Sequence, residues 1–530
     1  MELFSVVVWL FCYSGLFGSL AAARHLPRRL QSGSSNALEA RSHTAYYFDQ
    51  TINHFPHTTP YIPGAKGTYK QRYFVETSYY KPGGPVFLYL GGEGPIDNDT
   101  HLDASLITQF MKRFNGIGIV LENRFYGTSV PFNTSTTDEL LYLATEQVIA
   151  DFDVFARKVK LPGVENINAP STPWILFGGS YPGALSAFTK KTYPQTFWGA
   201  ISSSGVIHGQ VEYPQWYDPI QKLAPQDCVA SINDIVDKID VVVESKNQAA
   251  IKELKQIFGL SALTDIRDFA QTIAFPIGGP FFYPTYTWQE ISWTAAGHQD
   301  FFDFCDNVTD INAPAAVTAV DKALAKYTGG KAWKNLGNYA AYVKRVVLPL
   351  CASGDYNSPE CFGTQHPDWW GNVTSTAERS YLYTTCTEFG AYQAAYPKGR
   401  KSLLSRVVNA TYTQQWCNWA FPKGKYHSIP ASPDLAKWNV YGDFNFKADR
   451  LLFMDGSADP WKDLCYHSDL APPRTGFEQP QHLINGAGHV WDLRTLDDIN
   501  GEPQFVRAAT KLEIRTVASW LKEFTGPRYA

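Results

Sequence analysis

Apolar runs alternate with helical patterns between residues 43 and 204. Residues 139–160 carry apolar side chains at the spacing of one long helix. Four short runs of apolar residues are expected to form strands: Pro85–Leu90, Ile117–Leu121, Trp174–Phe177 and Phe197–Ser202. This rhythm of strand, helix and strand predicts a largely parallel β-sheet with helices on both faces.

The pattern changes after residue 204. Helical spacing dominates residues 205–442, and six of the eight cysteines lie in that range. Strand patterns return at Leu451–Met454 and His482–Ile484, and a helix is expected over residues 505–524. We therefore predict that residues 43–204 and 443–530 form one α/β domain. Residues 205–442 would form an inserted, mainly helical domain stapled by disulfides.

The N-terminus has the features of a secretory signal. An apolar stretch, Leu3–Leu20, ends in small residues, so residues 1–23 are interpreted as a signal peptide. The segment carries Glu2 and no basic residue at its start, which leaves an N-terminal membrane anchor as the alternative. Residues 24–42 are rich in Arg and Ser, as expected of a linker or propeptide. No later stretch approaches the roughly 18 apolar residues that span a bilayer.

Cysteines and glycan acceptor motifs also indicate secretion. The seven cysteines beyond the signal segment lack the C-x-x-C spacing of a zinc site, so disulfides are the better interpretation. Seven is odd, so at least one thiol stays free or pairs with another chain. Five Asn-x-Ser/Thr motifs are candidate glycosylation sites, at Asn98, Asn133, Asn307, Asn372 and Asn409.

Composition narrows the class of protein. With 44% hydrophobic and 15% aromatic residues among 530, the chain can bury a large core. The formal net charge is -4, and no long basic run is present. These features argue against intrinsic disorder and against a nucleic-acid partner.

A candidate nucleophile stands where a buried strand turns into a helix. The segment from Trp174 to Gly183 places Ser180 after two glycines and before a helix that starts near Tyr181. Such a corner exposes a serine hydroxyl, and the helix N-terminus favours a developing oxyanion. Pro182 occupies the last position of the G-x-S-x-G pattern, and a first helical turn tolerates it. The alternative is a glycine-rich turn with an incidental serine.

A serine nucleophile needs a histidine base and a carboxylate that orients it. The strand Leu451–Met454 leads to three aspartates that compete for the latter role: Asp455, Asp459 and Asp463. We favour Asp459, because it lies in a loop several residues past the strand and has the reach to approach an imidazole. Of the histidines that follow it, His489 alone lies on a glycine-rich loop directly after a strand. The predicted catalytic residues are therefore Ser180, Asp459 and His489.

An oxyanion hole requires a second backbone donor besides the N–H of Tyr181. The turn Gly91–Gly94 follows the first predicted strand and contains Gly92 and Glu93, the candidates for this donor. A simple tight turn is the alternative explanation.

Together these segments resemble the prolyl carboxypeptidase group of serine peptidases. That group includes lysosomal Pro-X carboxypeptidase, dipeptidyl peptidase II and fungal acid prolyl endopeptidases. The resemblance implies an α/β-hydrolase domain with a helical cap, the same triad, cleavage after proline and work at acidic pH. It rests on Tyr47–His54, Gln71–Tyr73, Gly91–Pro95, Glu122–Gly127, Gly178–Tyr181, Asp459–Trp461 and Gly488–His489.

A pocket for proline should be aromatic and short of hydrogen-bond acceptors, because a prolyl ring is compact and has no N–H. Trp461, beside the acid, is the first candidate for its wall, followed by Phe389 and Tyr392. The alternative for each of the three is an ordinary core aromatic. Glu388 could bind a peptide amine or be a solvated helix residue.

The sequence thus predicts a secreted peptidase that hydrolyses Pro-Xaa bonds through an acyl-enzyme, without metal or cofactor. An esterase or lipase on the same scaffold is one alternative, and a non-catalytic secreted binding protein is another. A lysosomal or vacuolar location and a homodimer both stay open. We hypothesise disulfides Cys351–Cys361, Cys386–Cys417 and Cys228–Cys305, with Cys465 unpaired.

Overall fold

A computed structural model describes residues 43–61, 64–96, 100–103, 105–279, 287–291, 300–474, 479–496 and 498–525. The predicted signal peptide, the linker over residues 24–42 and Asn98 lie outside these ranges. Within the described ranges, no helix has the length and apolar character needed to cross a membrane.

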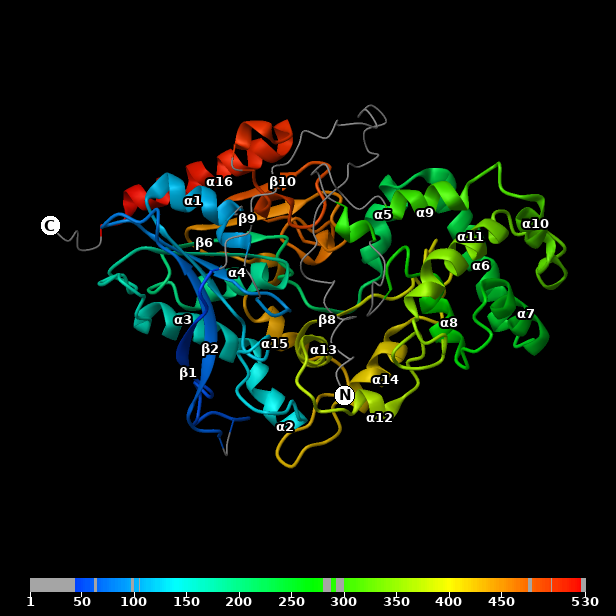
Figure 1. Cartoon of the computed structure of the whole chain (residues 1–530), viewed down its shortest axis with the longest axis horizontal. Helices are drawn as coiled ribbons and strands as arrows, with labels where there is room; N and C mark the ends of the chain where they lie inside the picture. Colours follow the sequence, from blue (N-terminus) through cyan, green and yellow to red (C-terminus); the bar gives the residue numbers. More distant parts are fainter. Residues whose placement is uncertain are drawn as a thin grey trace. The chain divides into compact units, whose positions relative to one another are not determined.

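An eight-stranded sheet forms the centre of one compact unit, which takes the described residues of 33–210, 373–390 and 421–530 (Figure 1). The strand order is β1-β2-β4-β3-β5-β6-β9-β10, and every pairing from β4 to β10 is parallel. The prediction of a largely parallel sheet is confirmed. The strands are β1 (Tyr46–Thr51), β2 (Thr68–Glu76), β3 (Val86–Leu90), β4 (Ile117–Leu121), β5 (Trp174–Gly179), β6 (Gly199–Ser203), β9 (Leu451–Gly456) and β10 (Gln481–Ile484).

Two antiparallel strands at one edge were absent from the prediction. β1 pairs with β2, and β2 pairs with β4, both antiparallel. β1 alternates half-buried and exposed residues over most of its length, whereas every residue of β4 is buried. β1 and β2 carry no continuous apolar run, so the apolar pattern used for the inner strands does not detect them.

Helices cover both faces of the sheet, as predicted. α1 (Leu106–Phe114) and α16 (Gln504–Glu523) contact each other on one face, and α3 (Thr145–Lys158) and α4 (Tyr181–Thr192) contact each other on the other (Figure 1). Three shorter helices complete this unit: α2 (Thr137–Leu140), α13 (Ala377–Thr384) and α15 (Leu435–Asn439).

The prediction of a single long helix over residues 139–160 is wrong, because two separate helices form there. α2 begins at a capping box made by Thr136 and Glu139, and α3 starts separately at Thr145. Ala144 between them has an extended backbone, with ψ 142°. The Thr145 N–H and hydroxyl donate to the carboxylate of Glu388, which stabilises the interruption.

The second compact unit comprises residues 211–372 and 391–420 and is mainly helical. The disulfide Cys228–Cys305 joins α6 to α9, and Cys351–Cys361 closes a short loop. Cys417 of this unit is disulfide-bonded, as is Cys386 of the unit that holds the sheet. The helices described in this second unit are α5 (Asp218–Leu223), α6 (Gln226–Glu244), α7 (Gln248–Phe258), α8 (Ile266–Ile273), α9 (Asp300–Val308), α10 (Ala315–Thr318), α11 (Leu336–Tyr342), α12 (Pro367–Trp370) and α14 (Ala410–Ala420). The short strands β7 (Gln210–Glu212) and β8 (Gly390–Tyr392) lie where the chain passes between the units.

A buried ionic network explains several of the sequence motifs near β4. Arg124, just past the end of β4, is 0% exposed and binds both carboxylate oxygens of Asp151 at 2.7 and 2.5 Å. Asp151 also bonds to His54 at 2.7 Å and accepts from Tyr69 at 2.9 Å. Each buried charge therefore has several partners, which offsets its loss of hydration. This network ties α3 to the strands β1 and β2.

Candidate active site

Ser180 stands on a strained turn between β5 and α4. Its φ is 63° and its ψ is -128°, an unfavourable conformation for a residue with a side chain. A Cβ at Gly178 would lie 2.7 Å from Pro182, and a Cβ at Gly183 would lie 2.5 Å from the carbonyl of Ser203. Only glycine allows these close approaches, so the two glycines permit the sharp turn.

Backbone hydrogen bonds fix this turn in place. The Ser180 N–H donates to the carbonyl of Ser203, on β6, at 2.9 Å, and the Ser180 carbonyl accepts from Ala184 at 3.1 Å. Pro182 lies in the first turn of α4, where its missing N–H removes no hydrogen bond. The serine hydroxyl is thus held above the carboxyl ends of the parallel strands.

Asp459 and His489 form a buried pair above the same edge of the sheet. The Nδ1 atom of His489 lies 2.8 Å from Oδ2 of Asp459. Oδ1 of Asp459 accepts the backbone N–H of Trp461, also at 2.8 Å. The aspartate is 0% exposed and the histidine 9%. An ionised carboxylate can only accept, so the contact with Asp459 places the proton of the neutral imidazole on Nδ1 and leaves Nε2 unprotonated, as a base requires.

The loop that carries His489 packs against the turn that carries Ser180. A Cβ at Gly179 would meet the side chain of Val490 at 2.7 Å and that of Leu493 at 2.5 Å. The Val490 N–H donates to the hydroxyl of Ser204 at 3.1 Å. Residues next to the histidine therefore touch residues next to the serine.

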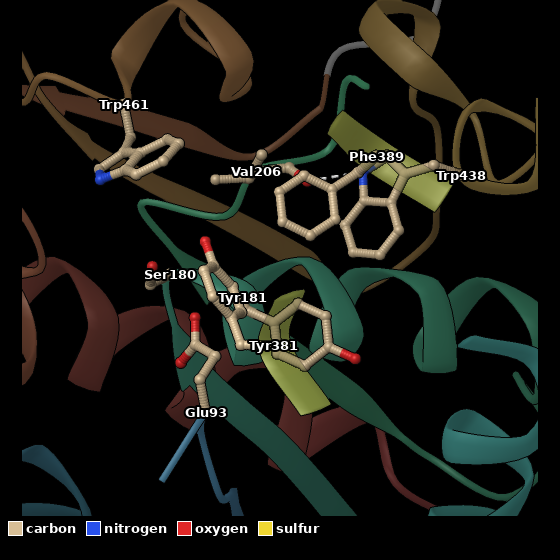
Figure 2. Close-up of a pocket in the computed structure, with 8 residues that line it drawn as sticks. All are labelled: Glu93, Ser180, Tyr181, Val206, Tyr381, Phe389, Trp438 and Trp461. Carbon is tan, nitrogen blue, oxygen red and sulfur yellow. Dashed lines mark hydrogen bonds between the residues drawn. The ribbon is translucent and has the colours of Figure 1, made fainter. Parts of the chain in front are cut away.

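A mostly aromatic pocket opens beside Ser180 (Figure 2). Figure 2 shows Trp461, Phe389 and Trp438 across the pocket from Glu93, and the indole N–H of Trp438 donates to the carbonyl of Val206 at 2.9 Å. Of the predicted wall residues, Trp461 and Phe389 line it. The full lining is Glu93, Ser180, Tyr181, Val206, Tyr381, Phe389, Trp438 and Trp461.

Sequence reasoning missed three of these residues: Val206, Tyr381 and Trp438. They come from three distant parts of the chain, and the sequence around each of them is typical of an ordinary core residue. Only Val206 lay near a recognised feature, the end of the strand β6.

The turn after β3 brings Gly92 and Glu93 to the site. A Cβ at Gly92 would lie 3.6 Å from Pro182, so this turn runs past the start of α4. Burial raises the pKa of Glu93 to about 7, and the charge of His489 opposes this rise. Glu93 is therefore uncharged at acidic pH.

Two other predicted substrate residues have partners elsewhere. The Glu388 carboxylate accepts from the hydroxyl of Thr145 at 2.5 Å, and burial raises its pKa to about 7. Glu388 is not among the lining residues of the pocket. Tyr392 belongs to the helical unit, where its hydroxyl donates to Gln414 at 3.1 Å.

The competing aspartates are engaged differently. Oδ2 of Asp455 lies 2.6 Å from Nδ1 of His467 and accepts the backbone N–H of His467 at 3.0 Å. Asp463 pairs with Lys462 at 2.9 Å. Asp455 and Asp459 thus each pair with a histidine, and it is Asp459 that pairs with His489.

Cys465 is a free thiol, buried below this loop. Its Sγ donates to the carbonyl of Trp461 at 3.2 Å, and burial raises its pKa well above the usual range. Such a thiol is inert as a nucleophile at neutral pH. Within the described ranges, no group of three or more His, Cys, Asp or Glu side chains is placed to hold a metal ion.

Four candidate glycosylation sites fall within the described residues. Asn133 and Asn372 are exposed, whereas Asn307 and Asn409 are half-buried. The side chain of Asn307 bonds to Asp303 and to Arg345, both at 2.7 Å. Exposure makes Asn133 and Asn372 the more accessible of the four.

A strained serine between a parallel strand and a helix, with histidine and aspartate on later loops of the same sheet, defines an α/β hydrolase. The chain belongs to the serine carboxypeptidase S28 family, whose family model matches residues 58–511. It is therefore a serine peptidase by family.

Individual relatives cover most of the chain. It is 34% identical to a "Probable extracellular serine carboxypeptidase" of Arthroderma benhamiae, over 93% of this chain and 71% of that protein. It is 30% identical to "Serine protease vicPa" of Bipolaris victoriae, over 86% of each chain. Among solved structures, proline iminopeptidase of Mycobacterium smegmatis aligns over 89% of this chain and 100% of its own, with 11% identity and a TM-score of 0.32.

Proposed function

We propose that this protein is a secreted serine peptidase that cleaves peptide bonds after proline through an acyl-enzyme, with Ser180, Asp459 and His489 as its triad. The observation that carries the proposal is the buried Asp459–His489 pair, on a loop that packs against the strained turn of Ser180.

The chemistry begins with the hydroxyl of Ser180. Nε2 of His489 takes its proton while Oγ attacks the substrate carbonyl, and Asp459 holds the resulting imidazolium through Nδ1. The protonated histidine then gives the proton to the departing amine. Water attacks the acyl-enzyme by the same route in reverse and regenerates Ser180.

Backbone N–H groups would stabilise the oxyanion of each tetrahedral intermediate. The N–H of Tyr181 points from the start of α4, where the helix dipole favours negative charge. The turn of Gly92 and Glu93, which runs past Pro182, supplies the second donor in this proposal.

Specificity for proline rests on the aromatic pocket. The rings of Trp461, Phe389 and Trp438 offer a flat apolar surface beside Ser180, and the prolyl ring needs no hydrogen-bond acceptor there.

We expect Trp461→Ala to lower kcat/KM for a Pro-Xaa peptide by about 10- to 100-fold, the scale of a lost apolar contact. The backbone N–H that Trp461 gives to Asp459 persists in this variant. Steady-state kinetics on matched peptides with proline or alanine before the cleaved bond would measure the effect. An equal loss on both peptides would show that Trp461 does not select proline.

An acidic working range is part of the proposal, and Glu93 supports it. Above pH 7 the ionised Glu93 would place a negative charge beside the developing oxyanion. We expect Glu93→Gln to keep kcat within about threefold of wild type near pH 5, where both side chains are neutral. The variant should lose less activity than wild type as the pH rises through about 7, measured as a kcat–pH profile. Superimposable profiles would contradict this role.

Export and extracellular action follow from the predicted signal peptide, the disulfides and the name of the Arthroderma benhamiae relative. We propose proline-containing peptides or proteins as substrates.

A substrate panel tests the function directly. Pro-Xaa peptides should be cleaved far faster than acyl esters of fatty acids, whereas a lipase would reverse that order. Mass spectrometry of one proline-rich polypeptide and its end-blocked form separates internal cleavage from terminal cleavage. Absence of turnover on every substrate and of labelling by a fluorophosphonate would indicate a binding protein.

A further inference from the structure

Two buried carboxyl groups lie behind the loop of His489. Asp492 follows the histidine by three residues, in the turn Trp491–Leu493, and Glu513 lies on α16. Asp492 is 1% exposed and Glu513 is 0% exposed. The turn packs against α16, and the charge of Asp492 acts on Glu513. Two buried carboxylates on packed elements repel each other, so a proton held by one of them favours the arrangement.

The remaining contacts of the pair agree with a shared proton. The hydroxyl of Ser203 donates to Oδ1 of Asp492 at 2.7 Å. The other three carboxyl oxygens of the pair receive no N–H or hydroxyl donor from the described residues. Buried carboxylate oxygens without donors are costly, and a proton between Asp492 and Glu513 removes part of that cost.

The pair is joined to both halves of the active site through β6 and the residue after it. Ser203 donates its hydroxyl to Asp492 and offers its carbonyl to the N–H of Ser180 at 2.9 Å. The next residue, Ser204, accepts the N–H of Val490, adjacent to His489, at 3.1 Å. A movement of Asp492 would therefore displace the loop of His489 and disturb the turn of Ser180.

We propose that Asp492 and Glu513 share one proton in the working enzyme and position the His489 loop, and that loss of this proton, alongside the ionisation of Glu93, limits activity at alkaline pH. The inference rests on the proposed function, because it takes His489 as the base. Both carboxyls are positioning residues, since neither lines the pocket beside Ser180.

The surroundings favour this role. Burial raises the pKa of Asp492 to about 7 and that of Glu513 well above its usual range. Two further carboxyl groups act on the pair. Asp455, bonded to His467, acts on Asp492, and Glu502, which accepts from Leu496 and Thr510 and lies near Arg507, acts on Glu513.

Loss of the proton should destabilise the folded protein, because the pKa values of both carboxyl groups are raised by folding. A carboxyl whose pKa is higher in the folded protein than in the unfolded chain favours folding at low pH. That contribution is lost as the pH rises from the ordinary range of the carboxyl to about 7 and beyond.

The test is Glu513→Gln, whose amide can donate to Asp492 at every pH. Since Glu93 titrates within the site in the same range, activity is compared in the Glu93→Gln background. We expect the alkaline limb of kcat/KM to move up by about one pH unit, so that about tenfold more of the maximal activity survives on that limb. Near pH 5 the two proteins should agree within about threefold.

Thermal unfolding gives a readout that does not depend on catalysis. The fall in Tm between about pH 5 and pH 8 should be smaller in Glu513→Gln than in its parent. Asp492→Asn should shift both properties in the same direction, which keeps the test available if one variant fails to fold. Asp268→Asn is the matched control, a buried carboxyl of the helical unit whose pKa is also raised by burial, and it should leave the activity limb in place.

The role of the pair would be overturned if Glu513→Gln lowered activity by the same factor at every pH. In that case the alkaline limb of kcat/KM would not move, and Tm would fall with pH as steeply as in the parent. That failure is distinct from failure of the proposed function, which would appear as turnover that survives Ser180→Ala.

Discussion

Ser180→Ala is expected to lower kcat on a Pro-Xaa peptide by at least about 10⁴-fold. The substitution removes the hydroxyl that forms the acyl-enzyme in the proposed mechanism and leaves the Asp459–His489 pair in place. Alanine carries the same Cβ through the strained φ of 63°, so the free energy of unfolding should change by less than about 0.5 kcal/mol. Burst kinetics and labelling by a fluorophosphonate should both disappear, while the far-UV circular dichroism stays as in wild type.

Ser186→Ala provides the matched control for this substitution. Ser186 lies on the same helix, α4, and its buried hydroxyl donates to the carbonyl of Pro182 at 2.9 Å, away from the pocket lining. Its activity should stay within a few fold of wild type. Turnover by Ser180→Ala near the wild-type rate, or its labelling by the probe, would remove Ser180 from the mechanism and with it the peptidase proposal.

The buried elements of the sheet could be predicted from sequence because their burial is local and continuous. β4 is buried at every position and β5 is as well, so their apolar runs stand out. β2 could not be predicted this way, since it carries Lys70, Gln71 and Arg72. Gln71 and Arg72 are buried only because distant partners, Gln50 and Glu122, satisfy them. Those partners are not visible in the pattern of the strand itself.

The candidate site also has some residues with a local sequence signal and others without one. Ser180 and His489 each follow a strand on a glycine-containing segment, which is a local signal. The pocket wall is not local, because Tyr381 and Trp438 reach it from short helices far apart in the sequence. Glu388 looked from sequence like a residue that could bind a peptide terminus. Its carboxylate instead accepts the N–H of Thr145, at the point where the helix predicted from the apolar spacing is interrupted.

The strongest test of the acid distinguishes two aspartates that lie four residues apart. Asp459→Asn should reduce kcat by about 10³- to 10⁴-fold, because an amide facing Nδ1 favours the imidazole tautomer that protonates Nε2 and removes the base. Its Tm should change little, since the amide oxygen can still accept the N–H of Trp461.

Asp455→Asn should give the opposite pattern. It weakens the buried contact to His467, which costs about 1–3 kcal/mol of stability and lowers Tm, while kcat/KM at a permissive temperature stays within a few fold of wild type. Kinetics and calorimetry on the two variants side by side make the comparison. If Asp455→Asn abolished turnover and Asp459→Asn preserved it, the base would be His467 and not His489, since each aspartate orients its own imidazole and neither can serve the other.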